Sequence, residues 1–288
     1  MAPASPGGGW DQTSRVLQRT LQTDGLARNV QVFNVEGAGG TIGLGQLARE
    51  TDDALVMTMG LVMVGAVLTN DSSTTLADVT PIARLTGESE ILVVPADSPY
   101  ESMADFVEAW AADPRGQPVA GGSAGGSDQI LAGLVAQATG VDPRQVNYIA
   151  YSGGGESLAA LLGNQVAIGI SGIGEYAEQV RSGDLKALAV SGTERSDQLP
   201  DVPTLMEQDI DVELVNWRGL MARPGMSDDA RDDLVRLITD AHDTEEWAGV
   251  LDTNGWDDEF LTAEDYAEFL RSEDERVRVV LTDLCLVP

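Results

Sequence analysis

The sequence predicts an α/β fold, and three observations lead there. Short strand-like runs alternate with helix-like runs over most of the chain, which is typical of βαβ units. Hydrophobic residues make up 43% of the chain, enough for a substantial core. The length of 288 residues fits two domains or one large one. Because strands separated by helices favour crossover connections, we expect parallel strands with right-handed crossovers.

The elements can be placed from apolar runs and helical periodicity. Strands are expected at residues 30–35, 54–59, 90–95, 118–120, 146–150, 166–170, 187–190 and 213–215. Helices are expected at residues 11–22, 43–50, 103–112, 127–138, 156–162 and 176–181, followed by helices at 228–242, 245–254 and 263–281. In the fourth of these helices, Ile130, Leu134 and Ala138 fall on one apolar stripe. Ser227 is a suitable N-cap for the helix that begins at residue 228.

Composition excludes several classes of function. Lys and Arg number 17 against 47 for Asp and Glu, a formal net charge of −30. Nucleic acid and anionic membranes are therefore poor partners, because binding phosphate depends on cationic side chains. With one His and one Cys the chain has no multi-histidine metal site, cysteine zinc site or internal disulfide. No acidic segment fits a calcium loop, so we expect neither a metal nor a cofactor.

Glycine-rich turns recur where an expected strand passes into an expected helix. They lie at residues 6–11, 37–43, 121–127 and 152–156. Glycine lets the backbone approach a ligand closely, and a helix N-terminus presents free N–H groups with a partial positive charge. Such turns bind anions, especially carboxylate or phosphate. Four turns of one design in one chain favour a ligand-binding role over tight turns alone.

Two better-known glycine motifs fit poorly. A dinucleotide fingerprint would need glycine at position 42, where Ile42 stands, and no P-loop surrounds the single lysine, Lys186. Residues 121–125 match the G-x-S-x-G of α/β-hydrolases, with Ser123 as nucleophile and His242 as a distant base. However, the glycines after Ser123 delay the helix to Ser127, and His242 lies inside a helix. A serine esterase stays the alternative function.

Six segments carry a resemblance to a known family. Residues 2–11 resemble the first ligand loop, and residues 34–43 the second signature, of the substrate-binding proteins of tripartite tricarboxylate transporters, the Bug-type solute receptors. Further matches lie at residues 121–129, 148–155, 183–190 and 199–205. The motifs come in the same order and the resemblance covers nearly the whole chain. The first nine residues read as a strand end running into a glycine loop, so we expect a missing upstream signal or anchor.

The resemblance implies a two-lobed periplasmic-binding fold that closes on its ligand and carries out no catalysis. Lobe one would comprise residues 1–94 and 220–288 and lobe two residues 95–219, with crossings at 91–95 and 212–221. It implies a monomer outside the cytoplasm that delivers a small organic carboxylate to integral-membrane transporter subunits.

In that family, backbone amides and waters hold the carboxylate. The residues that match its ligand loops here are Ser5, Gly7, Gly8, Gly9, Trp10, Asp11, Gly122, Ser123, Ala124, Gly125, Gly126, Ser127, Gln129, Ser152, Gly153 and Gly154. Asp11 is expected either to cap free N–H groups of its own helix or to face the ligand. Arg218 is expected either to pair with a distal ligand charge or to brace the hinge through an acid.

Overall fold

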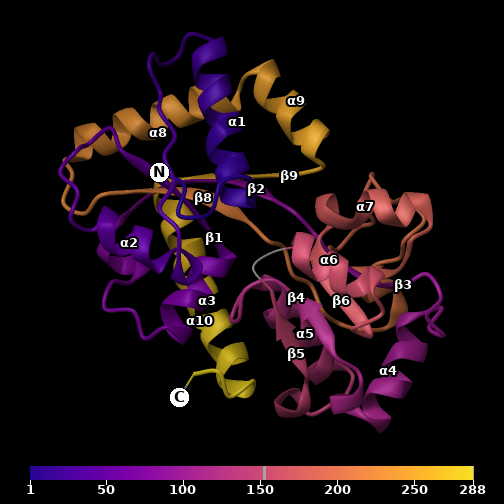
Figure 1. Ribbon diagram of the computed structural model, residues 1–288. Coiled ribbons are helices and arrows are strands. Elements are labelled where there is room, and N and C mark those ends of the chain that lie inside the picture. The colour runs from indigo at the N-terminus through magenta and orange to yellow at the C-terminus, as the bar shows by residue number, and fades with distance from the viewer. Residues whose placement is uncertain (152–153, 288) are drawn as a thin grey trace. The chain divides into compact units, whose positions relative to one another are not determined.

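The chain forms two α/β units (Figure 1). The computed structural model describes residues 1–151 and 154–287. The first unit comprises Met1–Gly87 and Trp217–Arg278, and the second comprises Glu88–Asn216 and Val279–Pro288. The boundary expected between residues 94 and 95 would separate strand β3 (Glu90–Pro95) from its hydrogen-bonded neighbours β6 and β7, so these residues belong to the second unit. The last ten residues belong there too, not to the first unit.

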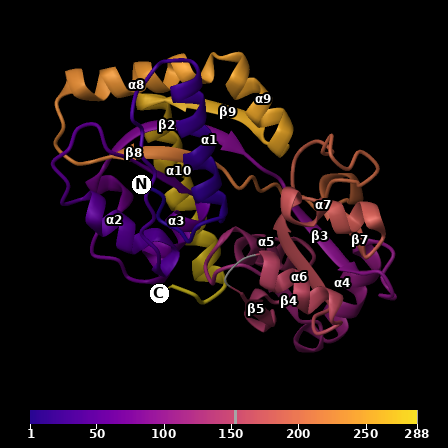
Figure 2. The ribbon, with the colours of Figure 1, turned by 45° about the horizontal axis from the view of Figure 1, so that its top comes forward.

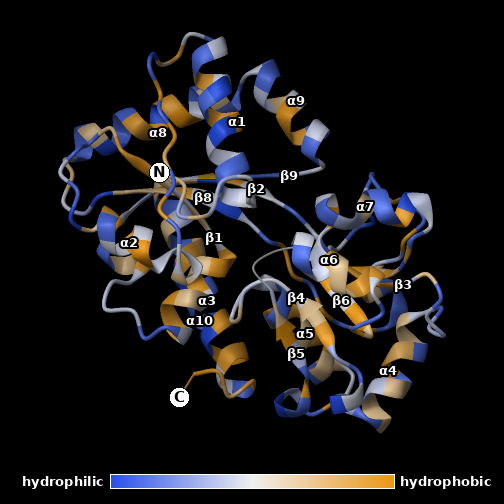
Figure 3. Cartoon of the chain, viewed as in Figure 1, coloured by the Kyte–Doolittle hydropathy of each residue, from blue (hydrophilic) through white to orange (hydrophobic). Residues whose placement is uncertain are grey.

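The first unit is built on a four-stranded antiparallel sheet in the order β1-β8-β2-β9. Its strands are β1 (Val56–Gly60), β8 (Arg218–Ala222), β2 (Thr80–Gly87) and β9 (Asp257–Thr262). The late strand β8 therefore lies between the two early strands. The edge strand β9 is hydrophilic and partly exposed (Figure 3).

Helices cover both faces of this sheet (Figure 2). On one face α1 (Gly9–Thr23), α8 (Asp228–His242) and α9 (Glu245–Asn254) enclose a core with Leu85, Leu220 and Trp247. The other helices of the unit are α2 (Thr41–Leu47), α3 (Leu61–Thr69) and α10 (Ala263–Asp283), which runs on into the second unit. Tyr266 of α10 packs against Gly219, which has no side chain to prevent it.

The second unit has a five-stranded mixed sheet in the order β5-β4-β6-β3-β7. Its remaining strands are β5 (Tyr148–Ala150), β4 (Val119–Gly121), β6 (Ile168–Gly172) and β7 (Leu185–Val190). Strand β4 is parallel to β5 and β6, whereas β3 is antiparallel to β6 and β7. The expectation of parallel strands is therefore met by β4 with β5 and β6, whereas the pairs formed by β1, β2, β3, β7, β8 and β9 are antiparallel. The antiparallel strands β3 and β8 are those at which the chain passes from one unit to the other.

The second sheet is also buried on both faces. Ile91 and Val93 of β3 face a core formed with α6 (Gly154–Leu162) and α7 (Ile173–Ser182). Leu92 faces the opposite side, where it lines a small apolar space with residues of α4 (Met103–Ala112) and α5 (Ser127–Ala138). This alternation within a wholly buried strand follows from the two-residue period of β structure.

Two expected strands are absent from the described chain. Residues 30–35 form no strand and make a single bridge, between Ala2 and Asn34. Residues 213–215 make one bridge, from Val215 to Ser89, and the strand begins later, at Arg218. The helices expected at 228–242 and 245–254 are confirmed, and Ser227 caps α8 by accepting the N–H of Ala230 at 3.2 Å.

Candidate functional site

The first glycine loop leads directly into helix α1. Gly7 has a φ of 87°, a conformation that glycine adopts without strain, and the Gly8 N–H donates to the Ser5 carbonyl at 3.2 Å. The Ser5 hydroxyl donates to Glu36 at 3.0 Å, and Trp10 is buried. The loop is thus a tight turn anchored to a neighbouring segment, and helix α1 starts at Gly9.

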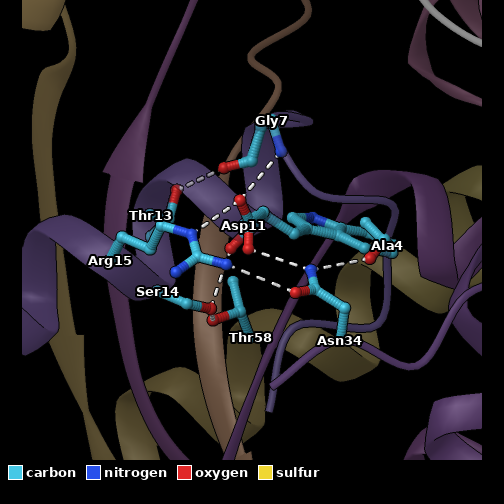
Figure 4. A network of polar contacts seen from close by, with 10 residues as sticks. Ala4, Gly7, Asp11, Thr13, Ser14, Arg15, Asn34 and Thr58 are labelled. Atoms are coloured by element: carbon cyan, nitrogen blue, oxygen red, sulfur yellow. Dashed lines mark hydrogen bonds and ion pairs between the residues drawn. The ribbon is translucent and has the colours of Figure 1, made fainter. Parts of the chain in front are cut away.

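Asp11 holds this loop in shape from inside (Figure 4). Only 2% of Asp11 is exposed, and its Oδ2 accepts the Gly7 N–H at 2.8 Å and Nε of Arg15 at 2.8 Å. Its Oδ1 accepts Nδ2 of Asn34 at 2.9 Å, and that amide nitrogen also donates to the Ala4 carbonyl. The hydrogen bond from Arg15 is the main reason that the pKa of Asp11 falls to about 2. Asp11 was expected either to cap N–H groups and stabilise the loop or to face the ligand. Its contacts with Gly7, Arg15 and Asn34 favour stabilisation of the loop.

The second unit repeats this arrangement at residues 122–129. The Gly122 N–H donates to Oδ2 of Asp128 at 2.6 Å, and the Gly125 N–H donates to Oε1 of Gln129 at 2.7 Å. Gly125 has a φ of 75°. In both loops an acid in the first turn of the helix binds an N–H group of the preceding glycine turn. Ser123 and Ala124 are exposed at the tip of the loop.

The helices that follow glycine loops differ from the other helices in their N-termini. Side chains cap α4, α8 and α9: the hydroxyls of Ser102, Ser227 and Thr244 accept backbone N–H groups. In the described chain α1, α2, α3, α5 and α7 have glycine as the N-cap residue, which has no side chain to cap them. In α7 the Gly174 N–H instead donates to Glu88 at 3.0 Å, and the first N–H group of α3 donates to the Trp217 carbonyl. At α1 and α5 an anionic ligand can take the place of an N-cap side chain.

The last of the four expected glycine loops, at residues 152–156, lies partly outside the described residues. Ser152 and Gly153 are among the residues not described, and Gly154 begins helix α6.

The serine esterase gains no support from the geometry. Ser123 is exposed four residues before α5 begins at Ser127, so it does not occupy a strand-to-helix elbow. His242 belongs to the first unit, where its Nδ1 lies 3.0 Å from Asp243 and its Nε2 lies 3.1 Å from Asp258. Its ring also stacks on Phe260 at 4.0 Å. Both ring nitrogens are thus engaged locally, and the side chain is 18% exposed, less than expected for a helix-surface histidine.

A buried acid was not singled out from the sequence. Glu90 of β3 is 0% exposed, and neither carboxylate oxygen has a hydrogen-bond partner among the described residues. Burial raises its pKa strongly, and the charge of Asp128 raises it further. Burial also raises the pKa of Asp128 to about 6. The signal was available in the sequence, because Glu90 begins an otherwise apolar strand.

Arg218 is the cation that the sequence singled out. It begins β8 and is 7% exposed, with its guanidinium 4.9 Å from the ring centre of Trp256. A Cβ atom built on Gly9 would lie 3.0 Å from Nη2 of Arg218. The guanidinium therefore lies directly against the first residue of α1.

Two absences concern the described residues alone. Within residues 1–151 and 154–287, no cluster of three or more His, Cys, Asp or Glu side chains could hold a metal ion. In the same stretches, no helix combines the length and the apolar character needed to cross a membrane.

Two α/β units joined by crossing strands, with glycine loops at uncapped helices, define a solute receptor of the periplasmic-binding type. This chain belongs to the tripartite tricarboxylate transporter family of receptors, whose family model matches residues 13–286. Receptors of this family are binding proteins and not enzymes, which confirms the non-enzymatic expectation. The chain is similar to BugT of Bordetella pertussis, with 31% identity over 212 residues, 72% of this chain. That match spans 64% of BugT, less than two thirds of its length.

Solved structures confirm the two-lobed periplasmic-binding fold. The structure of Rpa4515 from R. palustris with adipate has a TM-score of 0.88 at 20% identity and covers 99% of this chain and 96% of that chain. MatC from Rhodopseudomonas palustris with bound malate has a TM-score of 0.81 at 23% identity, covering 97% of this chain and 96% of that chain.

Proposed function

We propose that this protein captures a small carboxylate outside the cytoplasm and delivers it to integral-membrane subunits of a tripartite tricarboxylate transporter. The ligand would be held between residues 5–11 of the first unit and residues 122–129 of the second, with residues 152–154 completing the wall. The protein would act as a monomer, and its two units would close on the ligand.

The observation that carries this proposal is the pair of braced, uncapped glycine loops. Each loop is stabilised by its own first-turn acid, Asp11 or Asp128, which binds an N–H group of the turn. Among the described residues, the N-cap positions of α1 and α5 supply no side chain to the helix N–H groups. Local N–H dipoles act on a carboxylate at hydrogen-bond distance, whereas distant surface charges are screened beyond about 8–10 Å. A net charge of −30 is therefore compatible with an anionic ligand.

Relatives support the chemical class of ligand. MatC was solved with malate and Rpa4515 with adipate, and both are dicarboxylates. The family of this chain supports delivery to a membrane transporter. Backbone N–H groups recognise a carboxylate without reading the rest of the molecule, so these loops alone select a class of ligand and not one compound.

A thermal-shift screen with organic acids tests the proposal, followed by calorimetry on each acid that raises the melting temperature. The neutral diamide of each acid is the control ligand. We expect acids to stabilise the protein and diamides to have no effect. Stabilisation by a neutral sugar alone would contradict the proposal. Hydrolysis of a chromogenic ester that disappears in Ser123→Ala would replace it with the esterase.

A further inference from the structure

The second glycine loop, residues 37–43, has an uncommon backbone conformation that the proposed ligand contacts do not explain. Four successive residues have a positive φ: 120° at Gly37, 51° at Ala38, 60° at Gly39 and 90° at Gly40. Glycine adopts such angles without strain, whereas a residue with a Cβ atom does so at a cost. A strained backbone persists only where the surrounding structure holds it, and such segments gather at functional sites.

Helix α3 and the residue after it hold this loop in place. Nδ2 of Asn70 donates to the Ala38 carbonyl at 3.0 Å, and the Thr41 hydroxyl donates to the same carbonyl at 2.9 Å. A Cβ atom built on Gly39 would lie 2.5 Å from the Cβ atom of Ala66, so the loop backbone packs directly on α3. The loop is therefore a fixed part of the first unit.

Gly40 lies against the ring of Trp10. A Cβ atom at position 40 would lie 2.7 Å from Cζ3 and 3.1 Å from Cη2, at the outer edge of the six-membered ring. On the opposite side of the indole, a Cβ atom at Gly60 would lie 3.1 Å from Nε1. These distances are too short for ordinary contacts of a side chain. The two glycines thus form a slot that the Trp10 ring fills.

Trp10 connects this slot to the first glycine loop. It is the second residue of α1 and directly precedes Asp11, whose carboxylate accepts the Gly7 N–H. Trp10 is only 9% exposed, so its ring is part of the packing. The ring fixes the start of α1 against the second loop, while Asp11 fixes the glycine turn from within. Binding groups need support of this kind, because they act only when held within about 0.5 Å of the productive geometry.

We infer that the second glycine loop positions the first one, and that Gly40 is a positioning residue for ligand binding. Gly40 leaves room for the Trp10 ring, and the ring sets where the N–H groups of residues 7–11 lie. The inference rests on the proposed function and adds to it a residue that acts through Trp10 and not by touching the ligand.

The test compares Gly40→Ala with Gly25→Ala as the matched control. Gly25 follows the other end of α1 and has a φ of 69°, and no atom lies within 4 Å of a Cβ atom built there. Both variants place alanine at a positive φ, but only Gly40→Ala also displaces the Trp10 ring.

The ligand for this comparison is whichever of succinate, malate, adipate and citrate binds the wild-type protein most tightly by calorimetry. Gly40→Ala should weaken its binding by about 10-fold or more, and Gly25→Ala by no more than about 2-fold. Circular dichroism gives the melting temperature of each variant, so that affinities are compared where every variant is folded.

The indole N–H signals of the five tryptophans provide a readout that lower stability alone would not change. In the NMR spectrum, Trp10→Phe identifies the Trp10 signal by its disappearance. In ligand-free protein Gly40→Ala should move this signal, and Gly25→Ala should leave it at its wild-type position.

A double variant tests the slot directly. Phenylalanine at position 10 lacks the Cζ3 and Cη2 atoms that the new methyl group would meet. Gly40→Ala/Trp10→Phe should therefore lose less affinity than the two single losses combined, and it should fold even if Gly40→Ala does not.

The inference and the proposed function fail in different ways. Unchanged affinity or an unmoved Trp10 signal in Gly40→Ala would overturn the inference alone. An equal loss in Gly25→Ala, or a double variant that does not fold or in which the two losses multiply, would do the same. If none of the four acids binds the wild-type protein, both fail.

Discussion

Replacement of Asp11 by asparagine tests whether the first glycine loop is held by a buried carboxylate. Three donors converge on its two oxygens: the Gly7 N–H, Nε of Arg15 and Nδ2 of Asn34. Asparagine keeps the shape but has one carbonyl oxygen and adds an N–H donor facing these donors. Asp11→Asn should therefore loosen the loop while leaving α1 in place.

The size of the effect follows from the pKa of Asp11. In the folded protein it is lowered from the ordinary value of 3.8 to about 2. At about 1.4 kcal/mol per pH unit, ionised Asp11 contributes about 2 kcal/mol to the free energy of unfolding at neutral pH. Because the folded pKa is the lower one, this contribution is present above pH 3.8 and is lost as the pH falls through about 2.

Urea unfolding followed by tryptophan fluorescence between pH 2 and pH 7 measures this contribution. Asp11→Asn should lower the unfolding free energy by about 2–3 kcal/mol at pH 7, and the difference should shrink toward pH 2. Asp24→Asn, at the exposed end of the same helix, is the control and should change stability by less than about 0.5 kcal/mol. Carboxylate affinity should fall with Asp11→Asn. A difference that is absent at pH 7, or that does not vary with pH, would refute the bracing role.

Four further predictions concern the second unit and the whole molecule. Glu90→Gln should stabilise the protein by about 1–3 kcal/mol at pH 8, where ionisation of an unpartnered buried acid is unfavourable, and less at pH 4. Glu88→Gln should destabilise the protein, because Glu88 accepts the Gly174 N–H at 3.0 Å. If urea unfolding showed that Glu90→Gln and Glu88→Gln change the unfolding free energy in the same direction, this contrast would be contradicted. Gly125→Val should reduce ligand affinity more than Ser123→Ala does, because valine is strained at a φ of 75°. Ser123→Ala should weaken binding by about 0.5–3 kcal/mol, as measured by calorimetry. The reverse order of the two losses would argue against recognition of the ligand by the backbone. Saturating ligand should lower the radius of gyration in small-angle scattering, and an identical profile would indicate a rigid pocket.

The sequence predicts amphipathic helices with hydroxyl caps well. Ser227 and the acid-rich face of residues 228–242 predict α8 almost to the residue. Helix α3 was missed because its sequence is apolar on every side, so it has no period that distinguishes a helix from a buried strand. Strand direction could not be predicted from local pattern either, because β3 pairs with β6 and β7, which come about 75 to 100 residues later in the chain.

At the candidate site the sequence indicates the loops but not how they are held. Arg15 lies four residues after Asp11, and this spacing is readable as a helical ion pair. The hydrogen bond from Asn34, which lies 23 residues after Asp11, cannot be predicted from the sequence. The contact of Arg218 with Gly9 spans most of the chain, so the sequence left two roles for that arginine open.

The position of β8 between β1 and β2 has a consequence for how the chain folds during synthesis. In the described structure β1 pairs with β8 alone, and β2 reaches the sheet only through β8 and β9. Strands β1 and β2, within the first 87 residues, therefore have no partner strand when they leave the ribosome. Their sheet can form only after residue 222 has been synthesised. An N-terminal fragment that ends before β8 should lack the sheet of the first unit. The second unit contains β3 to β7 in one continuous stretch, so its sheet is the first that the growing chain can complete.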